Sequence, residues 1–447
     1  MIILPANTLS TGGFAVANSV RFNDNDSPSM YKTPGSGGNQ TTWTFSTWFK
    51  RGNLGSSQWI LDAYDGSNDE FHIYISSGNA IGIYTTGGGF GSNKSISTNN
   101  LVRDVSAWYH LVVRCDTTQS TASNRLRIYL NGTECSYATY NNFTEDGAGQ
   151  VSESGTKHWI GRRNAGDYFD GYFAEMVLVD GSSLAPTSFG EYDEDSPTIW
   201  KPKDVSGLTF GTNGFYLDFE DSSNLGNDAN GGTDLTESNL AATDQSLDSP
   251  TNNFPTLNVL YPTANLTFSE GNLNVVASDA NYRSISSTMG ATAGKWYAEF
   301  KAVSGFSGVD KSVGIYRADN TYVSTTGLGN FTSGTTWSYG AAGLVRTNNG
   351  TNDTEATFTD GDIISIAMDL DNNKLYFAKN NSWINSGDPT SGSTGTGAYA
   401  IVNATPKEFY HFAVASISSG GAALWSCNFG SPSYANSSDA ADANGYG

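Results

Sequence analysis

The sequence is poor in cysteine for a chain of 447 residues. Its three cysteines, Cys115, Cys135 and Cys427, are too few and too scattered to form a disulfide framework or a zinc site. We expect all three to be reduced packing residues, with Cys115 and Cys135 as the only pair suited to a bridge. The fold is therefore expected to depend on packing rather than on covalent or metal cross-links.

Basic residues and long apolar runs are also scarce. The chain has 23 Lys plus Arg against 44 Asp plus Glu, which gives a formal charge of −21. Such a surface repels phosphate backbones and anionic lipid, so nucleic acid is not an expected partner. No apolar run reaches membrane-spanning length, and the N-terminal MIILPANTLSTGG lacks the basic flank of a secretory signal. We therefore expect no membrane insertion, and synthesis in the cytoplasm without a signal peptide.

Glycine and aromatic residues are abundant instead. The 51 glycines and the 13% of aromatic residues predict short strands, many turns and aromatic cores. In WTFSTWFK, residues 43–50, Trp43, Phe45 and Phe49 fall on one face of an extended chain and Trp48 falls on the other. A strand with both faces covered is typical of stacked β-sheets.

The same alternation recurs along the chain. In YFAEMVLVD, Ala174, Met176 and Leu178 share one predicted face, and GKWYAEFKAV alternates in the same way. From 191 to 256 the pattern weakens to a polar connector with one strong strand signal, GFYLDFED. A second strand-dense region begins near residue 257. The sequence therefore predicts an all-β protein with two sandwiches.

Three segments in order resemble the laminin-G-like branch of the concanavalin A-like lectin folds. They are WTFSTWFKRG, AWYHLVVRCDTTQSTASNRLRIYLNGTEC and KHWIGRRNAGDYFDGYFAEMVLVDG. Within them, Asn131-Gly132 is a preferred tight-turn pair. Later segments resemble a SPRY domain, namely GKWYAEF, VGIYRAD, GDIISIAMDLDNNKLYFAKNNSW and CNFGS. Both families have sandwiches of antiparallel sheets.

The resemblances imply two concanavalin A-like antiparallel β-sandwiches of jelly-roll type, joined by an irregular linker. The expected parts are an N-terminal arm (1–13), a laminin-G-like sandwich (14–190), a linker with one strand (191–256), a SPRY-like sandwich (257–435) and a flexible tail (436–447).

The tandem resembles virion proteins of tailed phages, particularly marine ones. This resemblance implies a non-enzymatic structural protein on the virion surface, either a tail fibre or a capsid-surface fibre or decoration protein. Its lectin-like modules would recognise a host-surface glycan or protein receptor. Expected partners are other virion proteins and further copies of the chain, with a trimer as one arrangement. A purely architectural role as capsid decoration or spacer stays open.

Catalytic sequence motifs are not evident. Glycoside hydrolases of this fold carry Glu-x-Asp-x-x-Glu on one strand. The nearest string here begins at Glu191-Tyr-Asp193 and has Ser196 where the last Glu is required. We found no nucleophile elbow, phosphate-binding Gly-rich loop or paired His at metal-ligand spacing. A polysaccharide depolymerase acting on host capsule, with carboxylates from distant loops, remains the enzymatic alternative.

One Asp-rich stretch is a candidate for calcium, and a second only resembles a calcium loop. Laminin-G-like sandwiches bind Ca²⁺ at a rim with two Asp side chains, so the resemblance points to Asp62, Asp65 and Asp69, although ordinary Asx turns explain these residues equally well. The run from Asp369 to Asn373 lacks the Gly and the Glu that a helix-loop-helix calcium loop needs. We predict that this run is the tip of a β-hairpin.

Saccharide binding requires an exposed aromatic ring with polar groups beside it. Trp59, Trp337, Tyr339 and Trp383 lie close to predicted loops, and they are the candidate ligand-binding residues. Because the binding surface of SPRY domains is built from loops at one end of the sandwich, the regions 335–340 and 380–385 are favoured.

Overall fold

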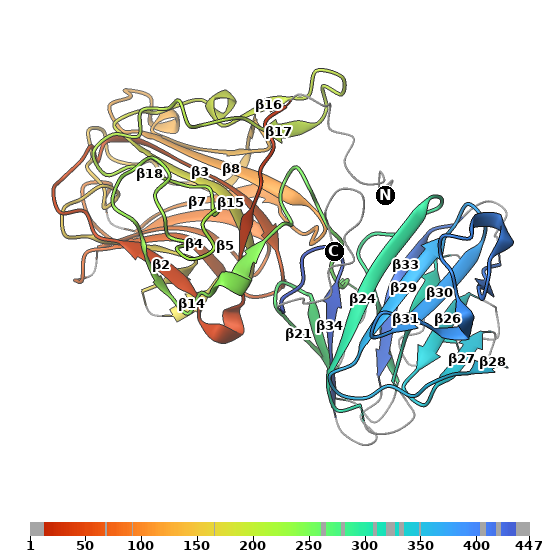
Figure 1. Cartoon of the computed structure of the whole chain (residues 1–447). Coiled ribbons are helices and arrows are strands. Elements are labelled where there is room, and N and C mark those ends of the chain that lie inside the picture. Colours follow the sequence, from red (N-terminus) through yellow and green to blue (C-terminus); the bar gives the residue numbers. More distant parts are fainter. Residues whose placement is uncertain are drawn as a thin grey trace. The chain divides into compact units, whose positions relative to one another are not determined.

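The computed structural model of the chain describes residues 13–434 except 68, 92, 165, 261–264, 279–281, 307–310, 319–326, 330–334, 348–349, 403–407 and 417–421. The predicted tail and all but the last residue of the predicted arm lie outside the described residues. In the described part, regular structure consists of antiparallel strands and six short 3-10 turns, which confirms the all-β prediction. The chain divides after Asn253 into an N-terminal and a C-terminal unit (Figure 1).

The N-terminal unit is built on two large sheets, called here sheet A and sheet B. The strands of sheet A, in pairing order, are β10 (Thr133–Glu134), β9 (Leu126–Leu130), β8 (Trp108–Asp116), β3 (Thr42–Arg51), β15 (Gly171–Asp180), β1 (Ser19–Phe22) and β20 (Gln245–Ser246), and β18 (Phe215–Leu217) also pairs with β15. Those of sheet B are β11 (Tyr137–Tyr140), β7 (Lys94–Leu101), β6 (Ala80–Thr85), β5 (Glu70–Ile75), β4 (Gln58–Tyr64), β12 (Lys157–Ile160), β2 (Ser29–Lys32) and β19 (Thr236–Ser238).

The core of this unit includes apolar side chains of both sheets. Trp43, Phe45 and Phe49 of β3 are fully buried in one cluster with Phe71 of β5, as the period of two along a strand requires. Trp48 belongs to a different cluster, which confirms the prediction that its side chain lies on the other face of the strand.

Cys115 and Cys135 of this unit and Cys427 of the C-terminal unit are free and buried.

A β-bulge in β15 changes the predicted face of that strand. The pairing with β3 shifts register between Ala174 and Val177, and Glu175 has a φ of 47°. An extra residue in one strand turns the following side chains to the other face. Ala174 therefore packs outside the sandwich core, whereas Met176 lies within it, so the prediction that they share a face is wrong.

The connector folds as part of the N-terminal unit. Besides β18, β19 and β20 it contributes most of the hairpin β16 (Gly190–Tyr192) and β17 (Trp200–Pro202), so the prediction of one strand is wrong. Val205 and Phe210 of the connector pack on Val177 and Val179 of β15. The indole of Trp200 donates to Nδ1 of buried His110 at 2.9 Å. The connector therefore covers the outer face of sheet A.

The C-terminal unit has two sheets of its own. One consists of β21 (Leu266–Ser269), β22 (Asn274–Ala277), β34 (Ala423–Asn428), β24 (Lys295–Ser304), β29 (Ile363–Asp369), β30 (Lys374–Lys379) and β31 (Ser382–Trp383), with β32 (Tyr399–Ala400) also pairing with β30. The other consists of β23 (Arg283–Ser286), β33 (Tyr410–Ser416), β25 (Ser312–Arg317), β26 (Thr336–Gly340), β27 (Leu344–Thr347) and β28 (Gly350–Thr354). Phe300, Ile364 and Val313 meet in the core that the two sheets share.

The predicted hairpin at Asp369 is confirmed. Asp369 pairs with Lys374 across the turn, and its Oδ1 accepts hydrogen bonds from the amides of Asp371 at 3.1 Å and Asn372 at 3.0 Å. Asn373 supplies the positive φ, 57°, that the turn requires. The acidic run therefore stabilises the turn of the hairpin.

The part of the chain that the structure describes has no helix with the length and hydropathy of a membrane crossing.

Candidate functional site

Two of the four aromatic residues singled out in the sequence are core residues. Trp337 is 2% exposed and donates its indole N–H to the carbonyl of Ala400 at 3.0 Å. Tyr339 is fully buried and donates its hydroxyl hydrogen to the carbonyl of Ala356. Their rings face the core that β26 shares with β24 and β29. Neither ring can stack on a ligand, and the prediction for this pair is wrong.

Trp383 is partly exposed but isolated. It lies in the short strand β31 and meets Tyr376 edge-on, with ring centroids 6.3 Å apart. Asn380, Asn381 and Asn385 beside it have positive φ values and form turns. The region 380–385 therefore offers one aromatic side chain.

The three Asp residues proposed for calcium do not converge. Asp62 is fully buried, and its Oδ1 lies 2.8 Å from Nδ1 of His72. Asp65 closes an Asx turn, because its carboxylate accepts hydrogen bonds from the amides of Ser67 at 2.8 Å and Asp69 at 3.3 Å. Among the residues that the structure describes, no three His, Cys, Asp or Glu side chains form a group that could hold a metal ion. In the described part of this stretch, the alternative explanation by an Asx turn therefore accounts for Asp65, and Asp62 contacts His72.

The outer face of sheet B carries a continuous set of aromatic side chains. Phe71 and Ile73 of β5 point into the core, so His72 and Tyr74 lie on the opposite face. Neighbouring strands add further rings to this face, by the same alternation in β2, β6 and β12 and across a bulge in β4, where Ile60 and Leu61 are both core residues. We call this set the aromatic face, and its residues are Tyr31, Trp59, His72, Tyr74, Tyr84 and Trp159.

His72 joins the polar groups of the aromatic face. Its ring stacks on Tyr84 with an interplanar angle of 8°, and its Nε2 lies 2.9 Å from Oε2 of Glu70. The same oxygen of Glu70 lies 3.3 Å from Nη2 of Arg163. The other ring nitrogen, Nδ1, lies 2.8 Å from Oδ1 of Asp62. Carboxylates, imidazole and guanidinium thus hold one another in fixed positions between the rings.

Tyr74 and Trp59 form a stacked pair on the outer face of sheet B. Their ring centroids are 5.7 Å apart and the planes are inclined by 20°. Tyr74 lies over Gly82 of β6, where a Cβ would come within 2.5 Å of the ring. The missing side chain at Gly82 therefore lets the ring lie against the sheet. Both rings remain partly exposed.

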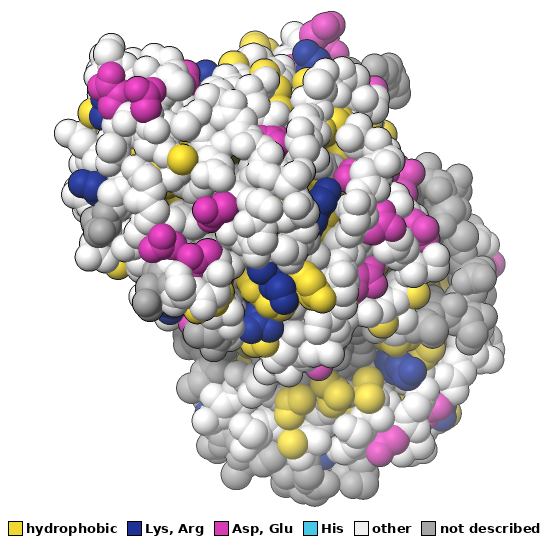
Figure 2. Space-filling view, turned by 90° about the vertical axis from the view of Figure 1, so that its left-hand side faces the viewer, with side chains coloured by type: hydrophobic (Ala, Val, Ile, Leu, Met, Phe, Trp, Pro, Cys, Tyr) yellow, Lys and Arg dark blue, Asp and Glu magenta, His cyan; other side chains and the backbone are white. Residues whose placement is uncertain are grey.

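A second part of the aromatic face carries cations. The ring of Trp159 lies 4.8 Å from that of Tyr31, and Nζ of Lys157 is 4.3 Å from the centre of Tyr31 and 4.7 Å from that of Trp159. Arg162 lies 4.5 Å from Trp159 and 5.2 Å from Tyr168, on the hairpin β13 (Arg162–Arg163) and β14 (Gly166–Tyr168). Lys and Arg side chains beside hydrophobic ones are visible on the face shown in Figure 2.

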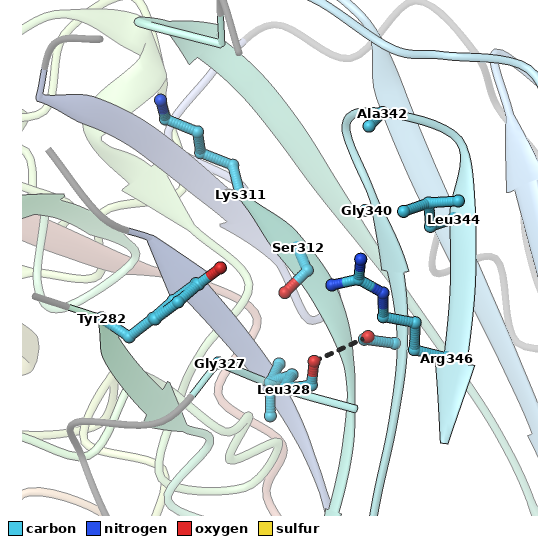
Figure 3. A pocket seen from close by; sticks show the side chains of 10 residues that line it. Tyr282, Lys311, Ser312, Gly327, Leu328, Gly340, Ala342, Leu344 and Arg346 are labelled. Carbon is cyan, nitrogen blue, oxygen red and sulfur yellow. Dashed lines mark hydrogen bonds between the residues drawn. The ribbon is translucent and has the colours of Figure 1, made fainter. Parts of the chain in front are cut away.

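Two hollows are weaker candidates. The one in Figure 3 lies in the C-terminal unit beside Lys311 and Arg346, and Oγ of Ser338 donates to Leu328 there at 2.9 Å. Its volume of about 20 Å³ holds about one water. The other, about 580 Å³, has no aromatic lining residue, and Asp180 in it already accepts hydrogen bonds from two backbone amides.

Sequence reasoning found only Trp59 of these six rings. The candidates were aromatic residues near predicted loops, whereas Tyr74, Tyr84 and Trp159 lie within strands. A usable signal was present, because Tyr74 and Tyr84 alternate with core residues in FHIYI and AIGIY. The pairing of β12 with both β2 and β4, which brings Trp159 beside Tyr31, is not visible in the sequence.

A family comparison matches this part of the chain. Residues 20–185 match the family described as the concanavalin A-like lectin/glucanases superfamily, in its laminin G form. The N-terminal sandwich has a concanavalin A-like fold. No curated protein sequence matches the chain significantly.

Several solved structures are similar to parts of the chain. The SPRY domain of human HERC1 matches at 16% identity over 35% of this chain and 88% of that one, with a TM-score of 0.28. A putative carbohydrate binding protein from Bacteroides ovatus matches at 14% over 50% and 58%, with a TM-score of 0.36. A heptameric SAP-like pentraxin from Limulus polyphemus matches at 15% over 39% and 80%, with a TM-score of 0.27.

Proposed function

We propose that the chain is a non-enzymatic glycan-recognition protein and that the aromatic face of the N-terminal unit is its binding surface. The observation that carries the proposal is the Trp59 and Tyr74 pair, two partly exposed rings stacked on each other on the outer face of sheet B, with fixed polar groups beside them. The apolar side of a pyranose stacks on such rings, and the partly exposed carboxylate of Glu70 and guanidinium of Arg163 bond its hydroxyl groups. His72 is buried and holds Glu70 in place.

Preorganisation supports the same proposal. Tyr74 lies over Gly82, and Glu70 is held by both His72 and Arg163. A ligand that meets groups already in place loses less conformational entropy on binding. The proposed surface also lies on strands rather than on mobile loop tips, which keeps its geometry fixed.

We further propose that the chain belongs to a tailed-phage virion, as a tail fibre or a capsid-surface protein. The ordered resemblance of both halves to such virion proteins supports this role. Purified particles should contain the chain in several copies. Mass spectrometry of particles that finds none would contradict the virion role without affecting glycan binding.

The binding proposal is tested with the purified full chain on a panel of bacterial surface polysaccharides. Trp59→Ala and Tyr74→Ala should each weaken the binding of a selected saccharide by about tenfold, because each removes a stacking ring. Trp383→Ala removes a partly exposed ring from the C-terminal unit and should leave the affinity unchanged. Loss of binding in Trp383→Ala alone would place the site elsewhere and overturn the proposal.

One observation keeps a depolymerase as the second candidate. Asp62 and Glu70 lie on either side of the His72 ring, and paired carboxylates cleave glycosidic bonds, but Asp62 is fully buried. Both are engaged by His72, and Glu70 also by Arg163, which favours binding over turnover. Incubation with the selected polysaccharide should release no oligosaccharides. Release that disappears in Glu70→Gln would establish the enzyme instead.

A further inference from the structure

We infer that the aromatic face selects acidic saccharides, with Lys157 and Arg162 binding the carboxylate or sulfate groups of the polymer. This inference rests on the proposed glycan binding and names its substrate class. It depends on a different part of the face from the stacking pair. Lys157 lies on β12, and Arg162 lies on the hairpin that follows it.

Both cations are held by aromatic rings. Nζ of Lys157 lies 4.3 Å from the ring centre of Tyr31 and 4.7 Å from that of Trp159. The guanidinium of Arg162 lies 4.5 Å from Trp159 and 5.2 Å from Tyr168. Each cation therefore contacts two rings, which fix its place on the face.

Neither cation is neutralised by a carboxylate among the described residues. Arg163 pairs with Glu70, but no ion pair joins Lys157 or Arg162 to any described Asp or Glu. The hydrogen bonds of Arg162 go to the backbone carbonyls of Arg163 at 3.0 Å and Asn164 at 2.9 Å. An aromatic quadrupole attracts a cation without cancelling its formal charge. Both charges are therefore available to an incoming anion.

Two ring contacts distinguish these cations from the other basic side chains of the described residues. Each of the other cation–ring contacts there joins a Lys or Arg to a single ring, whereas Lys157 and Arg162 each lie over two. These rings belong to or adjoin the surface that we propose for saccharide binding. An acidic sugar offers both an apolar ring face and an anion, so it fits both parts of the surface at once.

The overall charge favours a saccharide over nucleic acid as the anionic ligand. A formal charge of −21 repels the dense phosphates of a nucleic acid over a long range. An acidic polysaccharide carries its charges about one sugar apart and meets the face through stacking as well. The local cations therefore have to satisfy only a few anionic groups.

The test compares three polymers on the purified full chain. Dextran is neutral, dextran sulfate adds sulfate to the same backbone, and polygalacturonate carries carboxylates. We expect at least one acidic polymer to bind about tenfold more tightly than dextran at low salt, with the preference shrinking as salt rises. The comparison between the two acidic polymers identifies which anion is preferred. Equal affinity for all three would overturn the inference.

Variants assign the preference to the two cations. The double variant Lys157→Met/Arg162→Met should lose the acidic preference, whereas Lys157→Arg/Arg162→Lys should keep it. The matched control is Lys301→Met, because Lys301 also lies over a ring, 4.9 Å from that of Tyr434, but in the C-terminal unit. Thermal unfolding checks that each variant is folded. An acidic preference that survives in the double Met variant would contradict the inference.

Failure of this inference is distinguishable from failure of the proposed function. Saccharide binding that Trp59→Ala abolishes, but that shows no acidic preference, contradicts the inference alone. Acidic binding that depends on Lys157 and Arg162 but not on Trp59 or Tyr74 supports the inference and contradicts the stacking surface.

Discussion

Glu175 is an ionisable residue in a buried position, where an ionised carboxylate is poorly solvated. It occupies the bulge of β15 with a φ of 47° and is 6% exposed. Burial raises the pKa of its carboxyl from about 4.5 to about 8, although the hydroxyl of Tyr216, which donates to it at 2.7 Å, lowers it. The folded chain therefore holds this group neutral through most of the physiological range.

The raised pKa makes stability depend on pH. Between about pH 4.5 and 8 the folded state binds the proton of Glu175 more tightly than the unfolded state does, so stability falls as pH rises through this window. The variant Glu175→Gln cannot ionise. Relative to it, the free energy of unfolding of the native chain should fall by roughly 3–5 kcal/mol from pH 4.5 to pH 8.5, measured by urea titration. Parallel curves for the two proteins would contradict this account.

Single residues also mark the limit of sequence reasoning. The sequence around Trp337 and Tyr339 does not show that their rings are buried. Burial of these rings depends on the facing sheet, which is formed by residues distant in the sequence. In the same way, Asp62 lies in an Asp-rich stretch whose turn chemistry resembles a metal loop. Only the pairing of β4 with β5 shows that His72 is its partner.

At the scale of the elements, the pairing of β5 with β6 positions Tyr74, one ring of the stacked pair on the aromatic face. Tyr74 stands opposite Gly82 in this pairing, and its ring occupies the space that a side chain at Gly82 would fill.

A methyl group at Gly82 should therefore weaken binding without unfolding the sheet. A Cβ there would lie 2.5 Å from Tyr74, and the ring can swing away because it is the far end of a flexible side chain. We expect Gly82→Ala to lower saccharide affinity several-fold with little change in melting temperature. The control is Gly78→Ala on the same hairpin, where a Cβ meets only Ser76 at 3.7 Å. Unchanged affinity in Gly82→Ala would show that the ring position is not required.

Elements with local signals were predictable from the sequence. The alternation in 43–50 and the turn chemistry at Asn131-Gly132 and at Asp369 identified strands and hairpins, because these depend on neighbours in the chain. The bulge at Glu175 was not predictable, since no Gly or Pro marks it and the flanking residues continue an apolar alternation. The aromatic face was missed because it joins strands that are distant in sequence.

At the scale of the whole molecule, the connector belongs to the N-terminal sandwich. It supplies β18 and β20 to sheet A and covers Val177 and Val179 with Val205 and Phe210. The compact N-terminal unit ends at Asn253 rather than at the predicted boundary of 190.

Fragments of the chain should reflect this boundary. We expect residues 13–253 to unfold cooperatively in thermal melts followed by circular dichroism. A fragment of residues 13–190 exposes the apolar outer face of sheet A, and each large side chain uncovered costs about 1.5–3 kcal/mol. It should melt at a much lower temperature or aggregate. Equal melting temperatures for the two fragments would contradict the structural role of the connector.

The most direct test of glycan binding is a crystal structure of the full chain soaked with the saccharide that binds most tightly. The account predicts a sugar ring stacked on Trp59 or Tyr74, with an anionic group of the saccharide beside Lys157 or Arg162. Saccharide density in the Gly-lined hollow at Asp180 or beside Trp383, with the aromatic face empty, would contradict it.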